Sequence, residues 1–297
     1  YTGSPQGEIV GLSDRIVADL DGFVYEPDSR NVEYTTAPLC CYDRLLCALV
    51  RPRQRLRAYL KRLGDYTLIP GSSLSLGRSD VFYRSDPNNP YYTYIENSRP
   101  TGYHSTRWAV FPKTPAHVPL FESHAHFIRW TEQQLEAGTM QNVRHLWSSV
   151  RPNGNRRPYD LNRLELRICD LIVDPIALLA VTAFLEARLV QLMSDRRLDP
   201  LQTSQLSAAD LLAITDANEA AAAKNSLDAQ LQHWQDGRTI LARDWIEEIY
   251  QEVWPIAKAQ GFSCFLSPLK KILREGNIAQ QWLKLHESGS DCESIII

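Results

Sequence analysis

Charged residues alternate with aliphatic ones in the segment 162–170. Because successive side chains of a strand point to opposite faces, a strand here places Arg163, Glu165 and Arg167 on one face. The other face holds Leu164, Leu166 and Ile168. We therefore predict a strand with one face that packs against a core and one face that carries charge.

Two other segments with strand-like patterns show the same alternation. In NVEYTT (31–36), Glu33 shares a face with Asn31 and Thr35, opposite Val32, Tyr34 and Thr36. In HLWSSVR (145–151), Arg151 shares a face with His145, Trp147 and Ser149, opposite Leu146 and Val150. Together with the segment 162–170, these segments predict a sheet backed by helices. Its polar face carries two carboxylates and three guanidinium groups.

These residue types suit one kind of chemistry. Carboxylate oxygens bind Mg²⁺, and arginine binds phosphate or carboxylate through two parallel hydrogen bonds. The combination is typical of phosphoryl transfer onto an anionic substrate. The alternative is a solvated sheet face on which arginine and glutamate form cross-strand pairs. The segment 162–170 contains no lysine, which favours the functional interpretation.

Other chemistries have less support in the sequence. Glu122, His124 and His126 have the residue types of a zinc site, but a helix is predicted there, and positions two apart on a helix point away from each other. We therefore interpret them as ordinary helix residues. The sequence contains no P-loop, no G-x-G-x-x-G loop that opens a helix and no G-x-S-x-G elbow. Nucleotide binding thus requires another architecture.

Composition excludes several classes of protein. The chain has 297 residues, of which 44% are hydrophobic and 23% charged, as expected of a globular chain with a large core. Its net charge of -3 argues against a general binder of nucleic acid or membrane surfaces. The longest apolar stretch, Pro175–Leu185, is shorter than the ~20 residues that span a bilayer. Six cysteines without a C-x-x-C pair predict reduced thiols in a cytoplasmic protein.

Apolar residues three and four apart predict several helices. The predicted helices cover residues 45–63, 120–138, 175–193, 208–235, 242–260 and 268–286. In the first, Pro52 is expected to open a second helix and Gly64 to end it. We interpret its basic residues 51, 53, 55, 57 and 61 as a solvated face, with a phosphate-binding patch as the alternative.

A further short strand is predicted at 66–69, so the strands precede a helical run that begins near residue 175. This order predicts an α+β fold, with a sheet backed by helices and a mostly helical C-terminal half.

The segment HLWSSVRPNGNRRPYDLNRLELRICD closely resembles the bacterial carboxylate-amine ligase family, and within it the cyanobacterial-type glutamate-cysteine ligases. Its E-x-R-x-C-D strand after R-P is the most distinctive part. PDSRNVEYTTAP and GYHSTRW also match. NEAAAAKNSLDA resembles the family's N-x-x-x-A-x-R-x-G-L-x-A helix, with Lys224 and Ser226 as substitutions. The resemblance runs over nearly the whole chain. It implies a glutamine-synthetase-like fold, in which an antiparallel sheet curves into an open funnel with a polar concave face and with ATP and Mg²⁺ at its floor.

The resemblance also implies a reaction and roles for residues. The family forms γ-glutamyl phosphate from glutamate and ATP, and the cysteine amine then displaces phosphate to give γ-glutamylcysteine, in the first step of glutathione synthesis. Arg167 and Arg151 resemble the strand arginines that neutralise the transferring phosphate, and Arg107 resembles the one that holds the substrate carboxylate. The residues that resemble Mg²⁺ ligands are Glu33, Glu165 and, as a third, Glu26 or Asp28.

Two departures from the family pattern concern the extent of the domain. Family members begin with a strand that carries an E-x-E pair, whereas this chain starts at Tyr1, just after its expected place. The family also has a further strand and a helical segment where this chain has only Asn97 between Glu96 and Ser98. We therefore expect a single catalytic domain over 1–297 that lacks both pieces.

Three hypotheses follow from the sequence. The first is a glutamate-cysteine ligase, or a truncated copy of one, that takes ATP, Mg²⁺, L-glutamate and L-cysteine in the cytoplasm, without nucleic acid or membrane. The second is a sister ligase that joins a carboxylate to a different amine. The third is a non-catalytic remnant that binds ligand without turnover, which the missing E-x-E pair favours.

Overall fold

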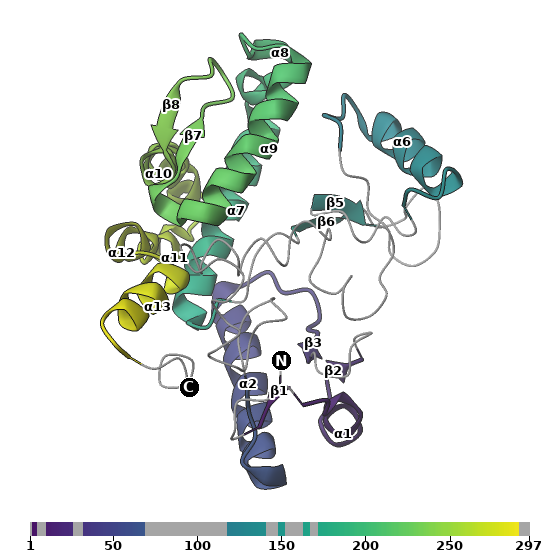
Figure 1. Cartoon of the computed structure of the whole chain (residues 1–297), viewed down its shortest axis with the longest axis vertical. Helices are drawn as coiled ribbons and strands as arrows, with labels where there is room; N and C mark the ends of the chain where they lie inside the picture. Colours follow the sequence, from purple (N-terminus) through teal and green to yellow (C-terminus); the bar gives the residue numbers. More distant parts are fainter. Residues whose placement is uncertain are drawn as a thin grey trace.

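The computed structural model describes residues 2–4, 10–25, 32–68, 118–140, 148–151, 163–166 and 172–290. In the first part of the chain, short strands alternate with helices (Figure 1). These elements are β1 (Thr2–Gly3), α1 (Ser13–Asp19), β2 (Phe23–Val24), β3 (Glu33–Tyr34), α2 (Tyr42–Gly64), β4 (Thr67–Leu68), α6 (His124–Glu136), β5 (Ser148–Arg151) and β6 (Arg163–Leu166).

From residue 175 onward the described chain is mostly helical and contains one short hairpin. The elements are α7 (Pro175–Ser194), η2 (Arg196–Leu198), α8 (Pro200–Thr203), α9 (Ala208–Asn225), η3 (Ser226–Asp228), β7 (Gln230–Gln232), β8 (Thr239–Leu241), α10 (Ala242–Ala259), α11 (Ser263–Leu266), α12 (Leu269–Glu275) and α13 (Ile278–Glu287).

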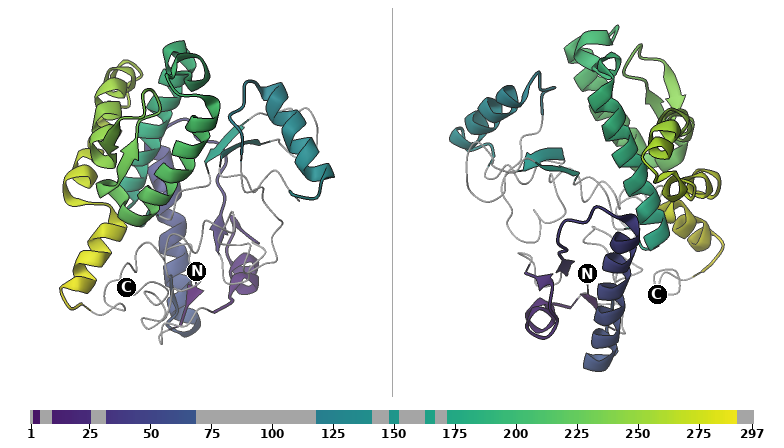
Figure 2. Two further views of the ribbon diagram at one scale, coloured as in Figure 1. Left: turned by 45° about the horizontal axis from the view of Figure 1, so that its top comes forward. Right: turned by 180° about the vertical axis from the view of Figure 1, so that it is seen from behind.

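The described strands form antiparallel pairs: β1 with β4, β2 with β3, β5 with β6, and β7 with β8. In all views, β2, β3, β5 and β6 lie on the opposite side of α2 and α7 from α10, α11 and α12 (Figures 1 and 2). Within the described residues, no ladder joins the pair that contains Glu33 to the pair that contains Glu165. The curved glutamine-synthetase-like sheet therefore stays a prediction.

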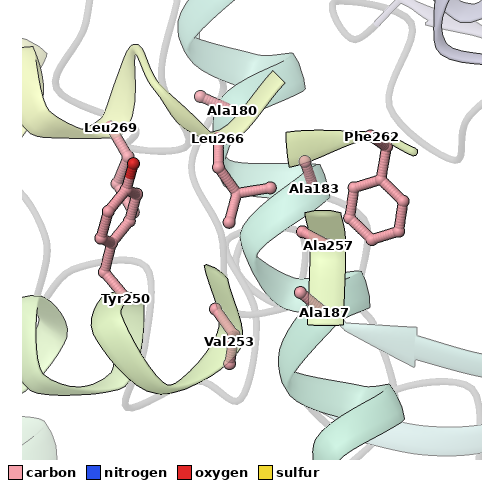
Figure 3. Close-up of a cluster of buried hydrophobic side chains, with 9 residues drawn as sticks. All are labelled: Ala180, Ala183, Ala187, Tyr250, Val253, Ala257, Phe262, Leu266 and Leu269. Carbon is pink, nitrogen blue, oxygen red and sulfur yellow. The ribbon is translucent and has the colours of Figure 1, made fainter. Parts of the chain in front are cut away.

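The largest core lies where α7 packs against α10 and α11 (Figure 3). Ala180, Ala183 and Ala187 recur three and four residues apart along α7 and are fully buried. Their small side chains let the opposing helices approach closely, and Val253 and Leu266 fill the space against them. A smaller core of α1, β2 and α2 is centred on Ile16 and Leu60.

Among the described helices, α7 is long and apolar enough to cross a membrane by length and composition alone. It extends nine residues beyond the apolar stretch that ends at Leu185. Its two charged residues both have partners on other helices: Glu186 accepts a hydrogen bond from Tyr42 of α2, and Arg188 pairs with Glu252 of α10 at 3.1 Å. These contacts are those of a helix that is packed within the protein.

The prediction that Pro52 opens a second helix is wrong, because α2 runs through it from Tyr42 to Gly64. Proline removes one hydrogen bond of the helix, yet here its ring is buried, as are Leu56 and Leu60 one and two turns later. Burial of this continuous stripe outweighs the lost hydrogen bond. The helix ends at Gly64, but the left-handed residue that caps it is Asp65, with a φ of 57°.

The helix predicted over 208–235 is also too long. The helix α9 ends at Asn225, and a hairpin follows in which His233 N–H donates to the Arg238 carbonyl at 2.8 Å. The signal was present in the sequence, since Asp-Gly at 236–237 is typical of hairpin turns, and Gly237 has a φ of +75°. The Asn218 side chain joins α9 to β7, accepting from Gln232 N–H at 2.7 Å and donating to its carbonyl at 2.8 Å.

The helix predicted over 268–286 is two helices, α12 and α13, separated by Gly276. Gly276 has a φ of +95°, which a helix cannot contain. Asn277 then caps α13: its side-chain oxygen accepts from Gln280 N–H at 3.0 Å. The break turns Asn277 toward the end of α9, where its amide donates to Ser226 Oγ at 2.5 Å.

Ser226 has a strained backbone, with φ 54° and ψ -128° at the end of α9. Glycine adopts such conformations without penalty, whereas other residues are strained by about 1–3 kcal/mol. We expect the Ser226→Gly variant to be more stable than the Ser226→Ala variant by about 1–2 kcal/mol. Both lose the hydroxyl group, so urea unfolding of the pair isolates the backbone effect. Equal stability of the two variants would mean that this corner carries no strain.

His233 is buried at the hairpin turn, with its ring 4.8 Å from that of Trp245. Burial and, to a lesser extent, Arg238 lower its pKa, while the opposing effect of Asp236 is smaller. The unfolded chain therefore binds a proton at this residue more readily than the folded chain, so its contribution to stability is lost as pH falls below about 6.5.

We expect the His233→Asn variant to lose part of this acid sensitivity, because asparagine keeps an acceptor for Gln235 N–H but does not titrate. Melting temperatures measured between pH 5 and 7.5 check the prediction. The same substitution at the exposed His124 is the control. If the melting temperature of His233→Asn depends on pH as that of the parent chain does, the prediction is wrong.

Candidate functional site

The pair β5–β6 brings together the polar faces of two strands. Its register places Ser149 opposite Glu165 and Arg151 opposite Arg163. Directly opposed residues share a face of an antiparallel pair, so these four positions lie on one face. The other face holds the positions of Ser148, Val150, Leu164 and Leu166. The sequence predicts that polar and apolar residues alternate within each strand. Only the register shows that the polar positions of the two strands lie on the same face of the pair.

The register also sets two positive residues against each other. Arg151 lies directly opposite Arg163, and Glu165 is two residues further along the same strand. Like charges at directly opposed positions destabilise an antiparallel pair. A bound anion that bridges two guanidinium groups removes this repulsion. The arrangement therefore suits an anionic ligand, with a carboxylate position beside it.

Glu33 lies on a different pair. It is exposed in β3 and faces Val24 of β2, next to Tyr34, whose ring lies 5.3 Å from that of Phe23. Phe23 belongs to the small core of α1 and α2, and its contact with the Tyr34 ring links β3 to that core. Glu33 is thus held on a strand pair that is linked to this core, with its side chain accessible.

The other sequence-predicted site residues lie outside the described residues. These are Arg107, Arg167, Glu26 and Asp28. Of the seven predicted positions, the structure therefore brings Arg151 and Glu165 onto one strand pair and places Glu33 on another.

The zinc interpretation of Glu122, His124 and His126 gains no support. His124 and His126 belong to α6, as predicted, and Ser123 caps this helix by accepting from His126 N–H at 3.1 Å. His126 Nδ1 lies 3.4 Å from the Glu122 amide nitrogen, which donates to it. Across the described ranges, no group of three potential metal-ligating side chains is assembled.

The basic run on α2 divides into two kinds of residue. The side chains at 51, 55, 57 and 61 are exposed, as the solvated-face interpretation predicts. Arg53 differs: it is half-buried and donates to the carbonyls of Val173 at 2.7 Å and Ile172 at 3.2 Å. Sequence reasoning missed this contact, because nothing in the helical spacing identifies a partner 120 residues away.

Comparison with known proteins gives a family match over nearly the whole chain. The family model described as glutamate-cysteine ligase family 2 (GCS2) matches residues 2–98 and 95–294. The two matched segments meet at 95–98, outside the described residues, where the sequence predicts a missing segment. The two missing pieces and the extent of the domain stay predictions.

Curated relatives point to the same family at low identity. A protein of Sorangium cellulosum named "Putative glutamate--cysteine ligase 2" is 28% identical over 203 residues, which are 67% of this chain and 51% of that protein. A protein of the same name from Solibacter usitatus is 25% identical over 213 residues, 70% of this chain and 51% of that protein. The chain thus spans about half the length of the curated relatives it matches. No solved structure matches it significantly.

Proposed function

Because the chain belongs to glutamate-cysteine ligase family 2, we propose that it is an ATP-dependent carboxylate-amine ligase that forms γ-glutamylcysteine. Glutamate and ATP give γ-glutamyl phosphate and ADP, and the cysteine amine then displaces phosphate. This is the first step of glutathione synthesis. The names of the curated relatives support the glutamate-cysteine reaction for this chain.

The register of β5–β6 is the observation that carries the proposal. It gathers the positions of Glu165, Arg151 and Arg163 on one face of a strand pair. In the proposed role, Arg151 and Arg167 offset the charge of the transferring phosphate, and Arg107 holds the glutamate carboxylate. No nucleophilic side chain is needed, because the γ-carboxylate of glutamate is itself the nucleophile.

The donor set fits magnesium. Glu33 and Glu165 supply the hard oxygen atoms that Mg²⁺ prefers, and Glu26 or Asp28 is proposed as a third ligand. When bound, Mg²⁺ neutralises charge on the phosphates of ATP. In the proposed site the carboxylates hold the ion, and the arginines orient the phosphate toward the acceptor carboxylate.

The partners proposed are small molecules: ATP, L-glutamate and L-cysteine. The net charge of -3 supports neither nucleic acid nor an anionic membrane as a partner. In the described part of the chain, Cys40, Cys41, Cys47 and Cys264 are free thiols, which supports a cytoplasmic location.

Two alternatives remain in competition with this function. The strand residues do not select the amine, so a sister ligase that uses a different amine has the same site. The other alternative is a remnant that binds ligand without turnover.

One assay separates the three functions. ADP release is measured with ATP, glutamate and Mg²⁺ while the amine is varied over cysteine, 2-aminobutyrate and other amino acids. We expect ADP release that depends on cysteine. Release that depends on another amine would support the sister ligase, and nucleotide binding without release would support the remnant.

A further inference from the structure

The contact of Arg53 with the chain before α7 has the geometry of a clamp. One guanidinium group donates from Nη1 to the Val173 carbonyl and from Nη2 to the Ile172 carbonyl. The group is half-buried, and burial lowers the pKa of Arg53. Partial burial of a charged group costs free energy, and its hydrogen bonds to these two carbonyls offset that cost.

A second contact shows that the clamp belongs to a fixed pairing of α2 with α7. Tyr42, at the start of α2, donates to Glu186 in the second half of α7 and stacks on Phe265 at 4.7 Å between ring centroids. Arg53 lies about 16 Å further along α2, at 1.5 Å per residue, and contacts the two residues that precede the N-cap of α7. The helices are therefore antiparallel and are held at two separate places.

The clamped carbonyls lie close in sequence to the proposed site. The strand β6 ends at Leu166, and Ile172 follows six residues later, a reach of at most about 22 Å. The clamp thus anchors the chain that leaves the strand of Glu165. Asp174, which accepts from Ile176 N–H at 2.9 Å, begins α7 directly after it.

We propose that Arg53 is a positioning residue, which holds the Ile172 and Val173 carbonyls and so fixes the α7 end of the connection that follows β6, the strand that carries Glu165. It has no contact with the reacting groups in this proposal. The importance of the clamp for turnover rests on the proposed function, whereas its effect on the order of β6 does not.

Three variants of the full chain test the clamp. Arg53→Met keeps the aliphatic stem and removes both donors. Arg53→Lys keeps the charge, but its single ammonium group cannot reproduce the planar two-carbonyl fork. Arg55→Met changes a neighbouring exposed arginine and is the matched control.

Peptide-level hydrogen exchange is the first measurement. We expect Arg53→Met to speed exchange at least about tenfold in peptides that cover 163–173 and to leave α7 peptides around 179–187 unchanged. Arg53→Lys should lie in between, and Arg55→Met should match the parent chain. Unchanged exchange at 163–173 in Arg53→Met, or equal acceleration in every peptide, would overturn the proposal.

Mg²⁺ dependence of ADP release is the second measurement. If the strand that carries the proposed metal ligand Glu165 is displaced, Mg²⁺ binds more weakly, whereas the rate at saturating Mg²⁺ changes less. We therefore expect Arg53→Met to raise the half-saturating Mg²⁺ concentration about tenfold with a smaller change in kcat. An unchanged Mg²⁺ requirement would overturn the link to the site. If the parent chain releases no ADP, the proposed function fails, and the exchange measurement still decides whether the clamp exists.

Discussion

Replacing Glu165 by glutamine should abolish Mg²⁺-dependent ADP release, with a loss on the order of a hundredfold to a thousandfold. Glutamine keeps the shape of the side chain but removes the negative charge that makes glutamate a ligand for Mg²⁺. Steady-state rates at several Mg²⁺ concentrations measure the effect. In the register of the strand pair, Glu165 lies directly opposite Ser149.

A stability measurement keeps this result interpretable. We expect the Glu165→Gln variant to unfold within about 0.5 kcal/mol of the parent chain, because glutamine has nearly the same shape and volume as glutamate. Glu287→Gln, an exposed change at the end of α13, is the matched control for activity. Full activity in Glu165→Gln would remove Glu165 from the metal site and with it the proposed role of the polar face of β6.

The largest effect on stability is expected from Leu266→Ala. Leu266 is fully buried, and Figure 3 shows it beside Ala180 and Ala183 of α7. The fully buried residues of α7 in this cluster are alanines, whose short side chains cannot fill the cavity. We expect a loss of about 2–5 kcal/mol in the free energy of unfolding, toward the upper end of that range. Urea unfolding followed by tryptophan fluorescence measures it.

The same substitution at an exposed leucine provides the control. Leu285 on α13 is 46% exposed, so Leu285→Ala should cost much less than Leu266→Ala. Equal losses at both positions would mean that the packing of α11 on α7 contributes little to the stability of the chain.

The sequence predicts local features of this fold well and distant ones poorly. The alternation of Arg163, Leu164 and Glu165 was enough to predict a two-faced strand, and 3.6-residue spacing was enough to find α7 and α10. The failure at Pro52 has another cause. There the proline ring is buried in line with Leu56 and Leu60, and this packing overrode a local signal for a helix start.

In the candidate site, too, the sequence predicts the local features but not the contacts between distant segments. Residue types and alternation identified Glu33, Glu165 and Arg151, but the register that opposes Arg151 to Arg163 depends on pairing two separate segments. Likewise, the partners of Arg53 lie on a different element far along the chain. Such contacts are set by packing, and no period in the sequence encodes them.

The connectivity around α7 has a consequence for how the chain can vary. Most partners of α7, namely α10, α11 and α12, follow it within a hundred residues, whereas the strand pairs β1–β4 and β2–β3 use only residues before it. Contacts between nearby segments form fast and need little chain closure. The core of the helical half therefore consists mainly of residues from that half. In evolutionary terms, a chain built this way can gain or lose segments among its early strands while its later half keeps a folded core.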